Sequence, residues 1–262
     1  MKVKNQKILL ISMPILVICF MFLGYIIAPN DPFKVNLALR FSNTSDHYPF
    51  GNDDLGRCIF SRILYGGRTT IYMVLLASIL IFILGILIGA ITSKVMMKKN
   101  IFVEALINAV TAIPPIAYLI IFVASWGSGV KTTLIALVIS YILRFVRLAR
   151  TQINLESEKA YVMCMTSLGA SKFRILLIHI LPNIISELIH YLCLSCADMI
   201  LAITAFSFIG LGLGDNVVEW GNMILEARKS IFIKPNLILY PMIAVLLTTV
   251  SFNLLGRQVI RK

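Results

Sequence analysis

Ionisable and sulfur-containing side chains recur within one long apolar stretch in the second half of the chain. They are Glu187, His190, Cys193, Cys196 and Asp198. His190 and Cys193 are one helical turn apart, a spacing that would let both bind one metal ion. Cysteine is also a good apolar filler inside helices, so this spacing alone does not establish a metal site. Asp198 is the stronger functional candidate, because an ionisable group within a membrane span marks a functional position by default.

Sequence signatures of catalysis are missing from the chain. It contains no G-x-x-x-x-G-K-[ST] phosphate loop, so it is not expected to hydrolyse ATP. No H-E-x-x-H pattern occurs, and no Ser/His/Asp grouping has a suggestive spacing. We therefore expect no catalytic residue, no metal and no cofactor, and the energy for any transport must come from another chain.

The amino-acid composition is that of a membrane protein. Of the 262 residues, 59% are hydrophobic and 14% are charged, whereas soluble domains carry about 25% charged residues. Apolar runs of about 20 residues recur, the length that crosses about 30 Å of hydrocarbon. The net charge of +12 could indicate nucleic-acid binding, but the basic residues cluster beside the apolar runs, as the positive-inside rule expects. The expected fold class is all-α and polytopic.

Six membrane spans are expected, in a single transmembrane domain that covers residues 1–262. Their approximate ranges are 8–28, 69–93, 102–125, 132–149, 183–211 and 236–256. The first run could be a signal peptide, but it is long for one and no small-residue cleavage site follows before Pro29, so an uncleaved span is predicted. Segments 29–68 and 212–235 are then outside, and segment 151–181 is cytoplasmic.

Basic residues orient these spans. Lysines precede the first span, Lys98 and Lys99 follow the second, and Arg144, Arg147 and Arg150 end the fourth. Because Lys and Arg are enriched in cytoplasmic loops, both ends of the chain are predicted to be cytoplasmic.

The stretch 161–183 is helical in period but too polar to cross a bilayer. One apolar stripe recurs at i, i+3, i+4 and i+7 and consists of Phe173, Leu176, Leu177 and Ile180. Gly169 can adopt the left-handed conformation that ends a helix, and Ser171 can cap the next one. We predict two short helices with a glycine hinge, the second running into Pro182 and the fifth span. An ordinary amphipathic connector would have the same pattern.

A second unusual stretch, residues 51–68, lies outside the predicted membrane. Ile59, Ile63 and Leu64 form an apolar stripe, and Arg57 and Arg68 point away from it. A helix lying in the membrane interface has this pattern. Its role could be to anchor the chain or to contact substrate.

The pair Pro114-Pro115 interrupts the third predicted span. Proline frees backbone carbonyl groups, so such a break must be buried in protein or face a cavity. Pro114 is therefore a candidate for a kink beside a translocation path, with a passive bend as the alternative.

Motifs spread over nearly the whole chain resemble the permease subunits of bacterial ABC importers, most closely the C-type permeases of the oligopeptide, dipeptide and nickel group. The outer motif of that group is matched by Gly51, Asp53, Leu55, Gly56, Arg57, Ser61, Arg62, Gly66 and Arg68. Its cytoplasmic loop is matched by Tyr161, Val162, Gly169, Ala170, Ser171, His179, Ile180, Leu181, Pro182 and Asn183. Shorter matches lie in 207–212, 220–223 and 252–256. The chain departs from the group at Met163, Cys164 and Met165, which replace Glu-Ala-Ala, and at Asn52, Cys58 and Arg257.

The resemblance implies a type I ABC-importer transmembrane fold in a bacterial plasma membrane. It implies that the cytoplasmic loop is a coupling helix that docks into a cleft of an ATPase. The residues carried over to this role, together with neighbours on the apolar stripe, are Tyr161, Gly169, Ala170, Ser171, Phe173, Leu176, Leu177 and Pro182. The implied partners are a second permease subunit in a heterodimer, two cytoplasmic ATPases and an extracytoplasmic substrate-binding protein, working by alternating access.

The substrate remains open at this point, because the same permease pattern serves short peptides, nickel and metal–chelator complexes. An ion-driven secondary transporter is the alternative function, and it would need carboxylates at mid-membrane. Only Asp198 and Glu187 offer such groups. An intramembrane enzyme is disfavoured because the catalytic groups are missing.

Overall fold

The computed structural model describes residues 2–97, 101–214 and 216–260. Lys98 and Lys99, which entered the topology prediction, lie outside these described residues. Within them the chain is helical, and its only β-type pairings are two isolated bridges in the segment before residue 59. The predicted all-α class is confirmed.

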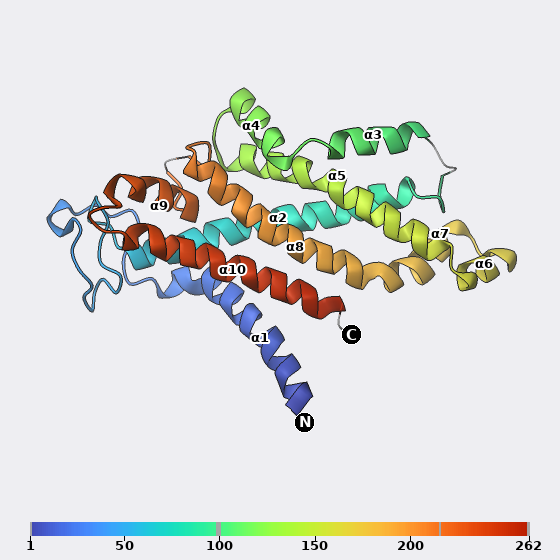
Figure 1. Cartoon of the computed structure of the whole chain (residues 1–262), viewed down its shortest axis with the longest axis horizontal. Helices are drawn as coiled ribbons and strands as arrows, with labels where there is room; N and C mark the ends of the chain where they lie inside the picture. The colour runs from blue at the N-terminus through green and yellow to red at the C-terminus, as the bar shows by residue number, and fades with distance from the viewer. Residues whose placement is uncertain (1, 98–100, 215, 261–262) are drawn as a thin grey trace.

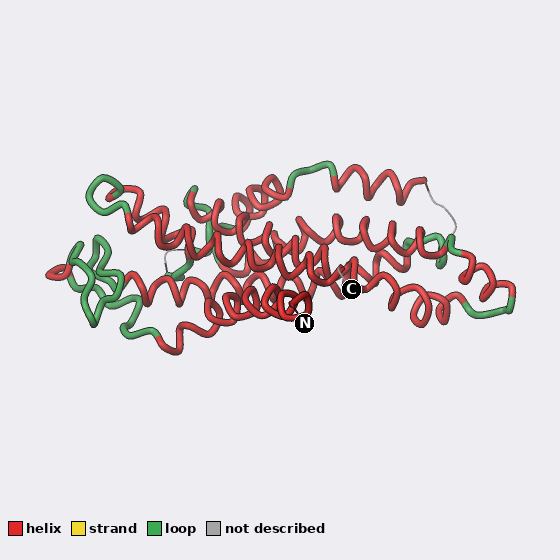
Figure 2. Tube along the Cα trace, turned by 60° about the horizontal axis from the view of Figure 1, so that its bottom comes forward, coloured by secondary structure: helices red, strands yellow, loops and turns green. Residues whose placement is uncertain are grey.

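Five long helices form an elongated bundle (Figure 1), and loops gather mainly at its two ends (Figure 2). These are α1 (Lys2–Leu23), α2 (Ile59–Ile91), α5 (Val130–Ser157), α8 (Leu181–Phe208) and α10 (Asn236–Ile260). The shorter helices are α3 (Ile101–Thr111), α4 (Pro115–Trp126), α6 (Ala160–Ser167), α7 (Lys172–Arg174) and α9 (Trp220–Ala227). Short 3-10 turns cover Gly24–Ile27, Leu37–Leu39 and Arg228–Ser230, and a π-helical segment covers Ile175–Ile180.

Among the residues that the structure describes, four helices are long and apolar enough to cross a membrane. They are α2, α5, α10 and the continuous helix Lys172–Phe208. A fifth span results if α3 and α4 are counted together as one bent pair. The first predicted span corresponds to α1 and the turn that follows it. The apolar part of this region, Ile11–Ile27, is shorter than the four candidate spans and is not counted among them. Six spans therefore remain a prediction, while the helical membrane fold is shown.

The third predicted span is broken at the proline pair. Helices α3 and α4 meet at 77° across residues 112–114. Pro114 is extended (φ −60°, ψ 142°) and directly precedes α4, which agrees with the bias of proline against continuing a helix. The predicted break is confirmed, and both helices contact α5 (Figure 1).

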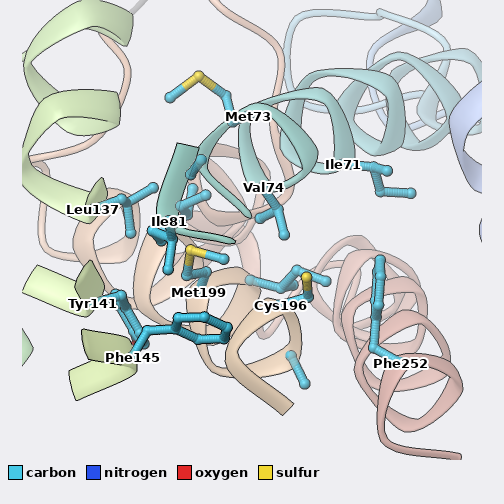
Figure 3. Close-up of a cluster of buried hydrophobic side chains, with 14 of the residues drawn as sticks. Ile71, Met73, Val74, Ile81, Leu137, Tyr141, Phe145, Cys196, Met199 and Phe252 are labelled. Atoms are coloured by element: carbon cyan, nitrogen blue, oxygen red, sulfur yellow. The ribbon is translucent and has the colours of Figure 1, made fainter. Parts of the chain in front are cut away.

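The core lies where α2, α5, α8 and α10 meet, and Figure 3 shows part of it. Small residues on α2 let α5 approach closely: a Cβ at Gly85 would overlap the ring of Phe145, and one at Gly89 would press on Ala149. Close approach at small residues is the usual way in which membrane helices pack. The α5 side chains Tyr141 and Phe145 thereby reach Met199 of α8 (Figure 3).

The predicted interfacial helix at 59–68 is wrong. These residues are the first turns of α2, which runs unbroken from Ile59 to Ile91. Ile59, Ile63 and Leu64 are buried inside the bundle rather than turned to lipid. The apolar stripe had been assigned to the membrane interface, whereas its actual neighbours come from α9 and α1, which are distant in sequence.

Candidate functional site

The segment between α5 and α8 folds much as its glycine and serine predict. Helix α6 ends at Ser167, and Gly169 follows with φ +80°. Ser171 then caps α7 by accepting a hydrogen bond from the Arg174 backbone N–H (3.4 Å). The second short helix runs on into the membrane helix, as predicted. It continues through the π-helical segment Ile175–Ile180 into α8, so that Lys172–Phe208 is one helix.

The π-helical segment changes which side chains of this region are exposed. Ile175, Leu176 and Ile180 are buried against the bundle, so the expectation that Leu176 contributes to a docking surface is wrong. Between residues 168 and 180, the exposed large apolar side chains are Leu168 (81%), Phe173 (64%), Leu177 (44%) and Ile178 (60%). We call these four residues the apolar coupling surface. Phe173 and Leu177 were predicted. Ile178 was missed because an ideal α-helical period places it off the predicted stripe, and Leu168 was missed because it lies in the turn after α6, outside that stripe.

A buried carboxylate joins the two ends of this segment. Glu156 of α5 is 6% exposed. Its Oε1 accepts hydrogen bonds from the Tyr161 hydroxyl (2.8 Å) and from Asn183 Nδ2 (3.3 Å). Asn183 Nδ2 also donates to the Tyr161 oxygen (3.0 Å), and Lys159 Nζ lies 2.7 Å from Glu156 Oε2. We call Glu156, Lys159, Tyr161 and Asn183 the inner clamp.

The inner clamp explains two residues of the loop motif that lie far apart in sequence. Tyr161 begins the motif and Asn183 ends it, and both contact Glu156. The Tyr161 oxygen also lies 3.2 Å from the His179 carbonyl oxygen. Burial, followed by the hydrogen bond to Glu156, raises the pKa of the Tyr161 hydroxyl, so it stays protonated and donates. Glu156 was not among the predicted residues, because its only signal in the sequence is its spacing from Lys159 and Tyr161.

The outer motif forms a network of buried ion pairs. Asp53 Oδ2 lies 2.7 Å from Arg57 Nε and 2.6 Å from Arg62 Nη1. Both arginines also reach Glu226 of α9, at 2.7 Å and 2.9 Å. We call Asp53, Arg57, Arg62 and Glu226 the outer charge network. It places the predicted Asp53, Arg57 and Arg62 together and adds Glu226, which no local pattern indicated.

Backbone contacts hold the outer motif in shape. Asp53 Oδ1 accepts hydrogen bonds from the backbone N–H groups of Leu55 (3.0 Å) and Arg57 (2.8 Å). Gly56 has φ +73°, and a Cβ there would overlap the Asn36 carbonyl oxygen. Ser61 is fully buried and accepts the Asn30 N–H (3.1 Å). Leu55 itself is 37% exposed, so it takes no part in the buried network.

Lys234 also fastens the outer segment to the last helix. Its ammonium group lies 2.5 Å from the Ser42 carbonyl oxygen and 3.4 Å from those of Phe41 and Asn52. Gly51 has φ +72°, and a Cβ there would press on both the Ser42 carbonyl and the Lys234 ammonium. Burial lowers the pKa of Lys234, and the Asp53 carboxylate opposes this shift.

Helix α9 is fixed by two buried side chains at its first turn. Trp220 Nε1 donates to the Ile63 carbonyl oxygen (3.0 Å). Glu219 is fully buried and caps α9, since its carboxylate accepts the backbone N–H groups of Gly221 (3.0 Å) and Asn222 (2.7 Å). Burial raises the pKa of the Glu219 carboxyl, against the lowering effect of these hydrogen bonds.

The two predicted pathway residues lie in different parts of the bundle. Pro114 is exposed at the break between α3 and α4, and Asp198 is exposed near the middle of α8. Among the described residues, no group of three or more His, Cys, Asp or Glu side chains could hold a metal ion. His190 and Cys193 instead lie beside Gly256 of α10.

Comparison with known proteins places these features in a family. A family model described as "Binding-protein-dependent transport system inner membrane component" matches residues 81–261. The chain is 32% identical over 213 residues to a glutathione transport system permease protein GsiD from Pectobacterium atrosepticum, covering 81% of this chain and 70% of that protein. It is 34% identical over 211 residues to a protein of the same name from Escherichia coli, covering 79% and 68%.

A solved structure has a similar fold. A chain in an inward-facing crystal structure of the MetNI methionine ABC transporter superposes with a TM-score of 0.62 at 15% identity. The match covers 76% of this chain and 95% of that one.

Proposed function

This chain belongs to the family of binding-protein-dependent transport system inner membrane components, in its peptide and nickel group, and we propose from that premise how its parts work. It is a multi-pass membrane protein and the permease subunit of an ATP-driven importer. The chain is a non-catalytic component, and ATP hydrolysis takes place in a separate subunit. The family implies a partner permease, ATPase subunits and a binding protein in general terms.

The apolar coupling surface is the proposed dock for a cytoplasmic ATPase. Leu168, Phe173, Leu177 and Ile178 expose large apolar side chains at the end of the bundle where loops join α5 to α8. A surface of this kind at a membrane protein's aqueous end is stabilised when a partner covers it. Tyr161, Gly169, Ala170, Ser171 and Pro182 shape the segment, and one such segment per permease would engage one ATPase in a complex with two of each subunit.

Short peptides are the proposed substrate class. The relatives are named for glutathione, which is itself a small peptide-like molecule. Nickel is less well supported, because the described residues contain no group suited to holding a metal ion. The chain would form the transport path with a second, non-identical permease, and an extracytoplasmic binding protein would deliver the substrate.

The proposed orientation places both chain ends in the cytoplasm of a bacterial cell. Segments 29–68 and 212–235 are then outside, where α9 and the outer charge network tie them together. Segment 151–181 is inside and carries the apolar coupling surface. Residues 1–262 act as one transmembrane domain.

Substitution of Gly169 tests the docking proposal. Its φ of +80° disfavours any side chain, and no other part of this chain lies within 4 Å of a Cβ placed there. Gly169→Asp therefore costs roughly 1 kcal/mol of backbone strain and adds a charge where an ATPase cleft would bury it. We expect the variant to remain in the membrane with its partner permease, to lose the ATPases on purification and to lose uptake.

Gly127→Asp is the matched control. Gly127 has φ +79° and equally open surroundings, but it lies in the predicted outer turn between α4 and α5. Its backbone (φ 79°, ψ 167°) lies in a region that is open essentially to glycine alone, so Gly127→Asp should carry at least as much strain as Gly169→Asp and should still retain the ATPases. If Gly169→Asp also retains them and takes up substrate normally, the segment is only a connector.

A further inference from the structure

Two opposite charges lie at nearly the same depth on neighbouring helices. Helices α5 and α8 pack together, and the inner clamp sets their register by joining Glu156 to Asn183. At about 1.5 Å per residue, Arg144 lies about 18 Å from Glu156 along α5, and Asp198 lies about 22 Å from Asn183 along α8. The guanidinium and the carboxylate are therefore level within about one helical turn, near the middle of both helices. Arg144, which was predicted to end the fourth span on the cytoplasmic side, thus lies well inside α5, because this helix continues to Ser157.

These two side chains are exposed and unpaired. Arg144 and Asp198 are both exposed. Neither makes a hydrogen bond or ion pair within the part of the chain that the structure describes. They are within electrostatic reach of each other and of the Tyr141 hydroxyl. Figure 3 shows Tyr141 and Phe145, the neighbours of Arg144, directed toward Met199, the neighbour of Asp198.

The face of α8 around Asp198 carries polar and small side chains. Tyr191, Ser195 and Asp198 follow each other at i, i+4 and i+7 and so share one side of the helix. Ala202 and Ala205 continue that side with small residues, and the exposed apolar side chains of Leu201 and Phe208 border it. A charged side chain exposed to hydrocarbon at mid-membrane is costly, and such groups face a bundle interior or an aqueous cavity. Arg144 and Asp198 are thus assigned to the inner wall of the assembled transporter.

We propose that Arg144 and Asp198 form a dipolar site in the transport path that binds the oppositely charged ends of a zwitterionic substrate. The guanidinium of Arg144 suits a free carboxylate, with which it can form two parallel hydrogen bonds. The carboxylate of Asp198 suits a protonated amine. This inference rests on the proposed function, and it adds that the permease itself selects for both charged termini of a short peptide.

Uptake by the complete complex in proteoliposomes tests the site. The probes are trialanine, which has both charges, its C-terminal amide, which lacks the carboxylate, and N-acetyl-trialanine, which lacks the amine. Because the same binding protein serves every variant, a change in the uptake ratio between two probes reports on the permease. Arg144→Gln should lower the ratio of trialanine uptake to uptake of its amide about ten-fold. Asp198→Asn should lower the ratio of trialanine uptake to uptake of its N-acetyl form by a similar factor. Each change is the size expected for loss of one charge-assisted hydrogen bond.

Thiol labelling locates the two positions independently. In a background without the native cysteines, Arg144→Cys and Asp198→Cys should react with a charged, membrane-impermeant methanethiosulfonate reagent in the purified complex. Leu246→Cys is the control, since Leu246 is 60% exposed on α10 in an apolar stretch and should not react in lipid. No reaction at positions 144 and 198 would show that the partner permease covers them and would overturn the site.

The outcomes separate this site from the function on which it rests. If the wild-type complex shows no ATP-dependent uptake of trialanine, the peptide importer itself is refuted, and the site is refuted with it. If wild-type uptake is normal and the two ratios stay unchanged in the variants, only the dipolar site is overturned.

Discussion

Glu156 shows how one buried carboxylate can organise a whole functional segment. It holds the first and last residues of the loop motif on the same oxygen, Oε1, while Lys159 neutralises its charge from the other side. Tyr161, Asn183 and Glu156 also bond one another, so removing one member leaves the others with unmet hydrogen bonds. The shape of the proposed coupling segment therefore depends on a residue outside the loop motif.

The first prediction concerns coupling through Glu156. Glu156→Ala removes a buried acceptor from two donors, which costs about 1–3 kcal/mol and loosens α6 from α8. We expect the ATPases to remain bound while uptake per ATP hydrolysed falls several-fold, measured in proteoliposomes. Glu158→Ala is the control, because Glu158 pairs with Lys94 at the surface with 60% of its side chain exposed, and such pairs contribute about 0–1 kcal/mol. Equal coupling ratios in both variants would contradict a role for the inner clamp.

Glu219 gives a pH-dependent prediction. Burial raises its folded-state pKa above the ordinary value of 4.5, so the folded protein holds this proton more tightly than the unfolded chain does. Its contribution to stability is therefore greatest at acidic pH and declines as the pH rises from about 4.5 through the raised pKa. Glu219→Gln has no titrating group and can still cap α9.

The melting temperature of Glu219→Gln minus that of the wild type should therefore increase between pH 4 and pH 7. The measurement is thermal unfolding of the purified protein in detergent across that range. A difference that stays constant with pH would show that the buried carboxyl does not titrate there.

At the scale of elements, charged side chains just before α2, on its first turn and on α9 hold the outer end of the bundle together. Sequence reasoning found Asp53, Arg57 and Arg62 because they lie within one motif. It could not find Glu226, since ion pairs with a residue 169 positions away leave no local signal. For the same reason the buried stripe of Ile59 and Ile63 was mistaken for a lipid-facing one.

The prediction for this element is a loss of stability in Arg62→Met. Arg62 has 5% of its side chain exposed and bridges Asp53 to Glu226. Its removal leaves both carboxylates with one cation fewer, and breaking a buried pair costs about 3–5 kcal/mol. The melting temperature of the purified protein should fall by several degrees or more. Arg68→Met, which removes an exposed guanidinium lying 4.1 Å above the Tyr25 ring, should change it much less, and equal losses would argue against the network.

For the whole molecule, hydropathy and charge indicated the fold class well. Long apolar runs must be helices in a bilayer, because only helices satisfy their own backbone there. Helix ends were harder to predict. Residues 175–180 adopt a π-helical segment that joins the coupling segment to α8, and its phase shift moved Leu176 inward and Ile178 outward. Pairings such as Glu156 with Asn183 depend on tertiary register, which apolar period alone does not encode.

The prediction for the whole molecule is its orientation. Single cysteines at Asn43 and Asn216, in a background without native cysteines, should react with an impermeant reagent added to intact cells. A single cysteine at Ser157 should react only after the membrane is opened. Reaction of Ser157→Cys in intact cells would show that the topology is the reverse of the predicted one. The apolar coupling surface would then lie outside the cell, where no ATPase could bind it.

The contacts of Lys234 have a consequence for biosynthesis. Its ammonium group contacts carbonyl oxygens 182 and 192 residues earlier in the chain. At about 5–20 residues per second, a ribosome needs roughly 10 to 40 s to make the intervening chain. During that time the outer segment has been translocated without its final cation and without Glu226. We expect a nascent chain truncated before residue 226 to expose residues 40–57 to added protease, and full-length chains to become resistant only once the last span has been inserted.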